Sequence, residues 1–344
     1  MATLDADLVL EGGGVRGIAL VGAIAALEER GYRFHRVAGT SAGAIVGALV
    51  AAGIPASRML QIMSELDYRR FEDGGALTRL GWPGQLLTLL ARNGIHRGDE
   101  LRDWLHEVLA EHDTRTFADL RTDDPESSLP SQEDYRLVVM TSDISQGCLR
   151  RLPWEYPRYG LAPDDMEVVD AVRASMSIPY FFRPVRLRDQ VEDDKCWLVD
   201  GGMLSNFPVD VFDRRDDTTP RWPTIGIKLS ARADAAQGVR HPIRGLWSMS
   251  TAMLGTLTSF YDRIHLERED VIARTIFVDT MKVRATDFDL DRVTQQQLYD
   301  NGWKAAEKFL DGGDDRPAWD FETYLERFGS PAATTDERPD GAAG

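Results

Sequence analysis

A serine between two glycines, placed where a strand runs into a helix, constrains this chain more than any other stretch. Residues 34–38 predict a strand, Gly39-Thr40-Ser41-Ala42-Gly43 follows directly, and the Ala-rich residues 44–52 predict a buried helix. A serine at such a strand-to-helix turn is typical of a nucleophile elbow. The five residues also occur by chance in many proteins, and it is their position that favours a catalytic role.

The elbow depends on its glycines, because side chains at Gly39 and Gly43 would clash in so tight a turn. We expect a strained backbone at Ser41, which pushes its Oγ out at the top of the sheet. The helix that starts at Ala42 points free N–H groups and the positive end of its dipole at Ser41.

A second glycine-rich turn precedes the elbow. Residues 8–10 predict a strand, 12–17 read GGGVRG, and 18–30 predict a helix. The spacing Gly12-x-Gly14-x-x-Gly17 fits the dinucleotide fingerprint, but that motif also requires an acidic residue at the end of the second strand, where this chain has Ser41. A purely structural turn is another alternative. We favour a nest of backbone N–H groups that holds the oxyanion of a tetrahedral intermediate beside Ser41.

The order strand, glycine turn, helix, strand, elbow, helix predicts an α/β fold with a parallel sheet. Both turns then lie at the carboxyl ends of adjacent strands, close together. Residues 68–97 are less regular, and 122–134 predict a surface loop. The remaining patterns predict helices at 56–66, 99–111, 166–175, 243–266 and 294–310, and strands at 135–141, 148–152, 197–199, 224–229 and 276–278.

A serine hydroxyl needs a base, and the six histidines are poorly placed to supply one. His35 starts a predicted strand, at the wrong end of the sheet, and none of the others follows a strand end: His96, His106, His112, His241 and His265. Asp200 does end the predicted strand 197–199, directly before Gly201 and Gly202. An Asp-Gly pair is also a common turn, and the local pattern leaves both interpretations open. A carboxylate within ~2.6–3.2 Å of the hydroxyl can accept its proton, and partial burial raises its basicity.

The formal net charge of −16 argues against nucleic acid as a partner. It also argues against electrostatic docking on anionic lipid headgroups, so that any membrane contact would have to be apolar or local. Cys148 and Cys196 predict two unpaired thiols in a reducing compartment, with one disulfide as the alternative. The sequence starts without the features of a secretory signal and has no stretch of ~18 apolar residues, so we expect a cytoplasmic protein.

Four motifs, in the same order along the chain, resemble those of the patatin-like phospholipases. Residues 9–17 (VLEGGGVRG) resemble the glycine-rich oxyanion block with its arginine, and 39–43 (GTSAG) resemble the nucleophile elbow. Residues 174–184 (ASMSIPYFFRP) resemble the S-x-S-I-P-x-x-F-x-P segment, and 200–202 resemble the D-G-[GA] block. The resemblance covers about residues 5–310 and favours a catalytic Asp200 over a turn.

The resemblance implies a three-layer α/β/α fold with a central, mostly parallel sheet. It implies hydrolysis of acyl esters in lipids by a dyad of Ser41 and Asp200, without a metal, and we expect no cofactor. The predicted hydrolase domain spans residues 5–310. An acidic C-terminal extension follows at 311–344, and we expect its end, from 330, to be disordered.

We therefore predict a serine acyl hydrolase in which Ser41 attacks the ester carbonyl and Asp200 takes its proton. The oxyanion and substrate would be held by Ala42 and by the loop residues Gly12, Gly13, Gly14, Arg16 and Gly17, with Arg16 ordering the loop. The supporting glycines are Gly39, Gly43, Gly201 and Gly202. The expected partner is a lipid or other acyl-ester substrate, with transient contact to a membrane surface and no nucleic acid.

Two apolar stretches are candidates for the substrate groove, although core packing is the commoner reason for each pattern. The first recurs at helical spacing and the second could form a lid or interface patch: Leu246, Met249, Met253, Leu257, Phe260 and Ile264, then Trp82, Leu86, Leu87, Leu89 and Leu90. Two alternative functions stay open. One is a transacylase, in which an alcohol or lysolipid replaces water; the other is a nucleotide- or lipid-binding module without catalysis.

Overall fold

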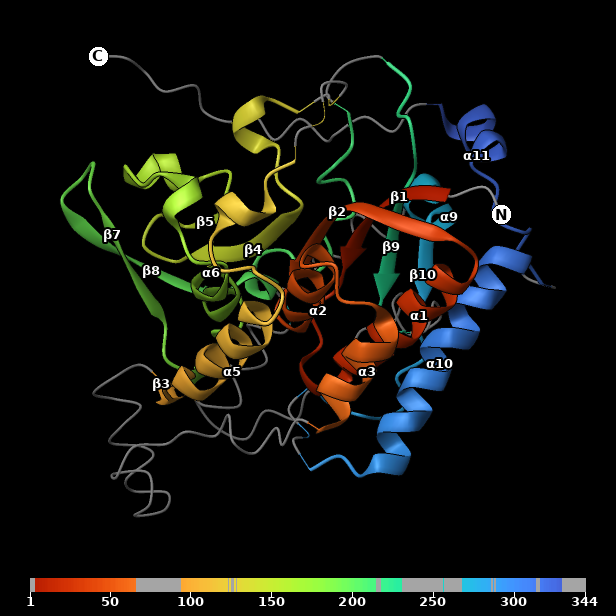
Figure 1. Ribbon diagram of the computed structural model, residues 1–344, viewed down its shortest axis with the longest axis horizontal. Coiled ribbons are helices and arrows are strands. Elements are labelled where there is room, and N and C mark those ends of the chain that lie inside the picture. The colour runs from red at the N-terminus through yellow and green to blue at the C-terminus, as the bar shows by residue number, and fades with distance from the viewer. Residues whose placement is uncertain are drawn as a thin grey trace.

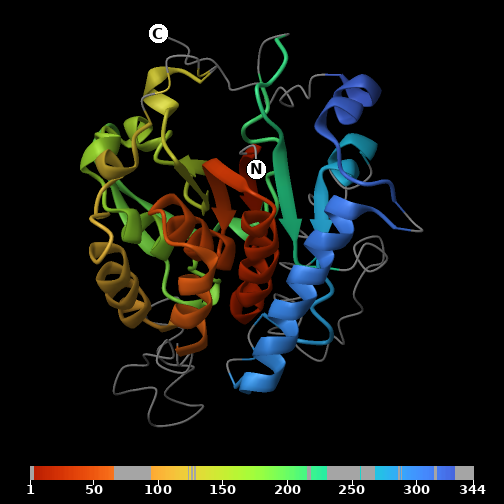
Figure 2. The same cartoon turned by 45° about the vertical axis from the view of Figure 1, so that its right-hand side comes forward.

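The computed structural model describes residues 4–65, 94–230, 256 and 268–329, apart from 123, 125, 126, 128, 215–217, 286, 288, 314 and 315. Helices flank a central sheet (Figures 1 and 2). The strands are β1 (Leu4–Leu10), β2 (Tyr32–Thr40), β3 (Gly94–His96), β4 (Leu137–Asp143), β5 (Cys148–Leu152), β6 (Tyr180–Phe182), β7 (Val185–Asp189), β8 (Asp194–Asp200), β9 (Thr224–Lys228) and β10 (Thr275–Phe277). The α-helices are α1 (Ile18–Glu29), α2 (Ala42–Ala51), α3 (Ala56–Glu65), α5 (Asp99–Ala110), α6 (Val168–Ser175), α9 (Glu269–Ala273), α10 (Arg292–Asp311) and α11 (Phe321–Phe328).

Eight of the described strands form one sheet in the order β10-β9-β1-β2-β4-β8-β7, with β5 paired to β4. The five strands from β10 to β4 run parallel. The sheet order and the flanking helices confirm the predicted α/β fold with a mostly parallel sheet. Leu10 at the end of β1 pairs with Gly39 near the end of the parallel strand β2. The glycine turn and the elbow therefore emerge side by side at the carboxyl edge of the sheet.

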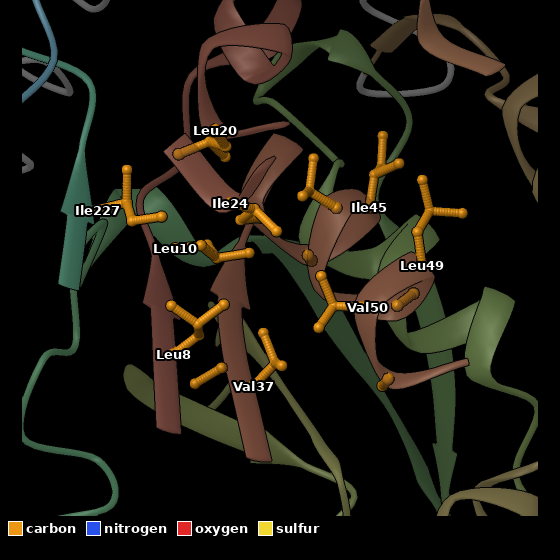
Figure 3. Packing of buried hydrophobic residues seen from close by; sticks show 14 of the residues in the cluster. Leu8, Leu10, Leu20, Ile24, Val37, Ile45, Leu49, Val50 and Ile227 are labelled. Carbon is orange, nitrogen blue, oxygen red and sulfur yellow. The ribbon is translucent and has the colours of Figure 1, made fainter. Parts of the chain in front are cut away.

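Helix α2 is apolar on all sides, and all ten of its residues are buried. A helix of this kind is stable only inside a core. Figure 3 shows why: Ile45, Leu49 and Val50 from α2 and Leu20 and Ile24 from α1 cover the strands below them. Their partners on β1, β2 and β9 are Leu8, Leu10, Val37 and Ile227, each at most 1% exposed.

The strand that ends at Asp200 enters the sheet from the opposite direction. Residues 137–140 of β4 pair with β2, 141–143 pair with antiparallel β8, and 139–143 pair with β5. Because β5 overlaps both of the other pairings, it occupies one edge of β4, and β2 and β8 share the other. Thr40 pairs with Met140 and Asp200 with Thr141, so the two strands meet end to end on that edge.

Most predicted elements are present with ends shifted by a few residues. The helix predicted at 166–175 starts at Val168, and the strand predicted at 135–141 spans Leu137–Asp143. β3, β6, β7, α9 and α11 were not predicted. Four predicted features lie outside the described residues: the helix at 243–266 except for residue 256, its apolar stripe, the apolar group at 82–90 and the disordered end from 330.

Two further expectations concern the cysteines and membrane insertion. Cys148 on β5 and Cys196 on β8 are unpaired thiols, as predicted. Among the helices in the described part of the chain, none is both long and apolar enough to cross a bilayer.

Candidate active site

Ser41 occupies a strained turn between β2 and α2. Its φ of 53° and ψ of −123° lie in a region that side chains with a Cβ rarely adopt. A Cβ on Gly39 would lie 2.2 Å from the Gly43 carbonyl oxygen, and one on Gly43 would lie 2.3 Å from that of Leu10. Both glycines are therefore required by space, as predicted from the sequence.

Asp200 lies at the end of β8, buried and near enough to Ser41 for the serine hydroxyl to lower the pKa of the carboxyl. Burial raises the pKa of this carboxyl to about 6, against the lowering effects of the Gly202 N–H and of Ser41. The Gly202 N–H donates to Oδ1 at 2.8 Å and fixes the carboxyl orientation. A carboxylate with this pKa is ionised at neutral pH and is more basic than an exposed aspartate.

The last residue of α6 and the loop that follows it contact both of these residues. Ser175 Oγ accepts the Ser41 N–H at 2.8 Å, and the Ser177 carbonyl oxygen accepts the Asp200 N–H at 3.0 Å. Met176 Sδ lies 3.5 Å from Ser41 Oγ. The segment at 174–184, noted in the sequence only for its motif, thus holds the backbones of Ser41 and Asp200 in place.

The glycine turn packs against the elbow. A Cβ on Gly12 would lie 3.1 Å from the Ser41 Cβ, and one on Gly17 would lie 3.3 Å from that of Ala42. The Gly12 N–H donates to the Asn206 carbonyl oxygen at 3.2 Å, which removes it from the predicted oxyanion donors. In the described part of the chain, no acceptor is found for the N–H groups of Gly13, Gly14 and Ala42, which leaves these three as candidates.

Charged side chains fix the other side of the glycine turn. Arg16 Nε donates to the Gly13 carbonyl oxygen at 3.1 Å, and its Nη1 donates to that of Leu229 at 3.3 Å. Burial lowers the pKa of Arg16, and the nearby Glu11 carboxylate partly offsets that effect. Glu11 is itself buried and accepts hydrogen bonds from Lys228 Nζ and from the Leu229 N–H. These bonds tie the turn to the end of β9.

Asn206 is the site residue that sequence reasoning missed. Besides accepting from Gly12, it donates from Nδ2 to the Gly12 carbonyl oxygen at 3.1 Å. Its Oδ1 fills the space that a Cβ on Gly12 or Gly202 would need. Asn206 therefore lies between the glycine turn and the turn after Asp200. Apart from its place six residues after Asp200, nothing in the sequence marked Asn206.

The described histidines make their contacts elsewhere. His35 stacks on Trp222 and pairs with Asp5, and His96 on β3 packs against Phe181 and Phe182. His106 and His112 lie on and just after α5, whereas His241 and His265 are outside the described residues. Within the described ranges, no cluster of three or more His, Cys, Asp or Glu side chains is arranged to hold a metal ion.

Taken together, these contacts place a serine hydroxyl near a buried carboxylate and beside the N-terminus of α2. The adjacent glycine turn has two N–H groups, of Gly13 and Gly14, with no acceptor among the described residues. A hydroxyl in contact with a base can act as a nucleophile, and amides aimed at one point can hold an oxyanion. The arrangement is chemically suited to acyl transfer.

Comparison with known proteins gives a family match. Residues 8–213 match the family model described as "Patatin-like phospholipase". "Uncharacterized protein YqhO" of Bacillus subtilis is 35% identical over 308 residues, which cover 88% of this chain and 97% of that protein.

Two other relatives are much longer than this chain. "Uncharacterized NTE family protein Rv2565" of Mycobacterium tuberculosis is 32% identical over 205 residues, 59% of this chain and 27% of that protein. "Lysophospholipase NTE1" of Saccharomyces cerevisiae is 27% identical over 202 residues, 59% of this chain and 10% of that protein. Among solved structures, VipD from Legionella pneumophila aligns with a TM-score of 0.49 at 16% identity, covering 88% of this chain and 66% of that one.

Proposed function

The chain belongs to the patatin-like phospholipase family, and on that premise we propose that it hydrolyses acyl esters of lipids with Ser41 as nucleophile and Asp200 as base. The observation that carries the proposal is the meeting of β2 and β8 on β4, which brings Ser41 near the buried Asp200 carboxyl, whose pKa the serine hydroxyl lowers. The strained backbone of Ser41 and the raised pKa of Asp200 support it, since both are typical of reactive groups.

The first half of the reaction forms an acyl-enzyme. Ser41 Oγ attacks the ester carbonyl carbon while its proton passes to Asp200, and the carbonyl oxygen becomes an oxyanion. The N–H groups of Gly13, Gly14 and Ala42 are the donors we assign to that oxyanion, and the dipole of α2 favours its charge. The bond to the leaving alcohol then breaks, and Asp200 returns the proton to the alcohol oxygen.

The second half repeats these steps with water. Asp200 accepts a proton from water, the resulting hydroxide attacks the acyl carbon, and Ser41 Oγ leaves and regains the proton. The products are a fatty acid and an alcohol or lysolipid. In this proposal Arg16 holds the glycine turn through the Gly13 carbonyl, so that the neighbouring amides face Ser41.

The test measures hydrolysis of a soluble p-nitrophenyl ester and of a phospholipid. We expect Ser41→Ala to lower kcat by roughly 10³-fold or more and Asp200→Asn by about 10²–10⁴-fold. Matched controls are Ser64→Ala on α3 and Asp103→Asn on α5, which keep full activity. A fluorophosphonate should label the wild type at Ser41. Full activity of either site variant on the ester would exclude the dyad.

A further inference from the structure

The β7–β8 hairpin, at the left of Figure 1, carries basic and aromatic side chains on one of its faces. The antiparallel register pairs Arg186 with Trp197 and Arg188 with Lys195. Because side chains alternate along a strand, these four lie on one face, while Leu187 and Cys196 lie on the other. The two arginines and the lysine are exposed, and Trp197 is half-buried.

This face concentrates positive charge in a chain whose net charge is −16. Arg188 and Lys195 stand directly opposite each other, and like charges at such a position destabilise a sheet. Arg188 forms an ion pair with the Asp193 carboxylate at 2.8 Å, and both side chains are more than 70% exposed. A pair so exposed adds little stability and opens readily. The unfavourable placement of two cations suggests a role in binding.

An aromatic ring and a hollow accompany the cations. The Arg186 guanidinium lies 4.3 Å from the centre of a Trp197 ring. A hollow of about 320 Å³ is lined by Arg183, Pro184, Arg186 and Trp197. Tryptophan prefers the boundary between water and the apolar part of a bilayer, and arginine binds phosphate through two parallel hydrogen bonds.

We propose that this face docks the protein on an anionic phospholipid bilayer, with a lipid phosphate held in the hollow by Arg186 beside Trp197. The inference rests on the proposed lipid hydrolase function. Nucleic acid fits less well, because its extended charge would meet the acidic remainder of the surface, whereas a headgroup needs only a local basic patch. The acidic turn at 192–194 lies at the far end of the hairpin, beyond Arg188 and Lys195, and the hollow lies at its base.

The docking face flanks the candidate active site but does not line it. Trp197 precedes Asp200 by three residues, which is about 10 Å along a strand. The alternation of side chains puts Trp197 and Asp200 on opposite faces of β8. Removal of the basic side chains should therefore weaken binding to a bilayer and leave the reaction with soluble esters unchanged.

The test compares vesicle binding by two triple variants, each made in the Ser41→Ala background. One is Arg186→Gln/Arg188→Gln/Lys195→Gln. The other, Arg292→Gln/Lys304→Gln/Arg327→Gln, removes three exposed cations from α10 and α11 and changes the net charge equally. Sedimentation uses vesicles of phosphatidylcholine with and without phosphatidylglycerol. We expect roughly fivefold weaker binding to the mixed vesicles for each cation removed from the hairpin, and no change in the control.

Several results would overturn the docking proposal: equal binding by both triple variants, equal binding to neutral vesicles, or binding that survives a rise from about 0.1 M to about 1 M salt. Preferential binding to polyglutamate would point instead to an acidic protein. With Ser41 intact, the hairpin variant should hydrolyse the soluble p-nitrophenyl ester at the wild-type rate. A wild type inactive on that ester would refute the proposed hydrolase, whereas the vesicle assay reports docking alone.

Discussion

The backbone of Ser41 stores strain that a single substitution can release. A residue with a Cβ at φ 53° and ψ −123° costs of order 1–3 kcal/mol, and glycine adopts this conformation freely. We expect Ser41→Gly to be inactive and about 1 kcal/mol more stable to urea than Ser41→Ala, which keeps the Cβ. Equal midpoints for the two variants would mean that the turn carries no such strain.

The raised pKa of Asp200 predicts how activity depends on pH. In the proposed reaction the base must be ionised, so kcat/KM should rise with pH and reach half its maximum at pH about 6. A pH–rate profile on the soluble ester measures this directly. A midpoint near 4, typical of an exposed aspartate, would contradict the burial of the carboxyl.

The same shift predicts how stability depends on pH. Because the folded pKa of about 6 lies above the unfolded value of about 3.9, the stability linked to Asp200 is full below pH about 4 and is lost as pH rises through 6. Asp200→Asn does not ionise and avoids that loss. It should unfold like the wild type at pH 4 and be about 3 kcal/mol more stable at pH 8, measured by urea denaturation.

At the residue scale, local sequence was enough for part of the site. Ser41, Gly39 and Gly43 follow from the geometry of one tight turn, whose five residues are consecutive in the sequence. Asn206 and Ser175 could not be found in this way. Their contacts with Gly12 and Ser41 depend on how distant parts of the chain come together, which the local pattern does not contain.

At the element scale, helices α1 and α10 pack closely against each other where each has a glycine. A Cβ on Gly302 would lie 2.0 Å from the Ala19 carbonyl oxygen, and one on Gly22 would lie 2.0 Å from that of Tyr299. Replacement of a mid-helix glycine by alanine ordinarily stabilises by roughly 0.5–1 kcal/mol. We expect the opposite for Gly302→Ala, a loss of about 1–3 kcal/mol, because the helices must separate.

Urea denaturation measures the free energy of unfolding of Gly302→Ala and checks this prediction. The matched control is Gln296→Ala, at an exposed position of α10. The control should be as stable as the wild type, since alanine favours helix. A stabilised Gly302→Ala variant would show that the crossing has room to spare.

The elements that sequence reasoning predicted best have a regular pattern of their own. The apolar run of α2 and the strands β1, β4 and β9 are of this kind. Helix α11 was missed because it lies in an acidic stretch and buries mainly Tyr324, whose ring packs on Trp319. The antiparallel direction of β8 could not be predicted from its own residues either, because the path of the β7–β8 hairpin sets it.

At the scale of the whole molecule, a buried ion pair joins segments that are far apart in the chain. Arg274, directly before β10, donates from both Nη atoms to the two carboxylate oxygens of Asp213 at 2.5 Å, and both side chains are about 1% exposed. Loss of one partner leaves a buried charge uncompensated. We expect Asp213→Ala to lower the free energy of unfolding by about 3–5 kcal/mol.

The double variant Asp213→Leu/Arg274→Met separates the cost of an unpaired charge from the value of the pair. Apolar replacements of both partners often match or exceed a buried pair in stability, so the double variant should recover most of the loss. Urea midpoints of the two variants decide the matter. A double variant as unstable as the single one would show that the pair itself stabilises the fold.

The end-to-end meeting of β2 and β8 fixes the distance between the last residues of the two strands. Both strands pair with the same edge of β4, so the backbone hydrogen bonds to β4 set the spacing between Ser41 and Asp200. Neighbouring loops can lengthen, shorten or change sequence without altering that spacing. If the proposed function holds, selection can therefore vary which substrates reach Ser41 while the spacing between Ser41 and Asp200 stays constant.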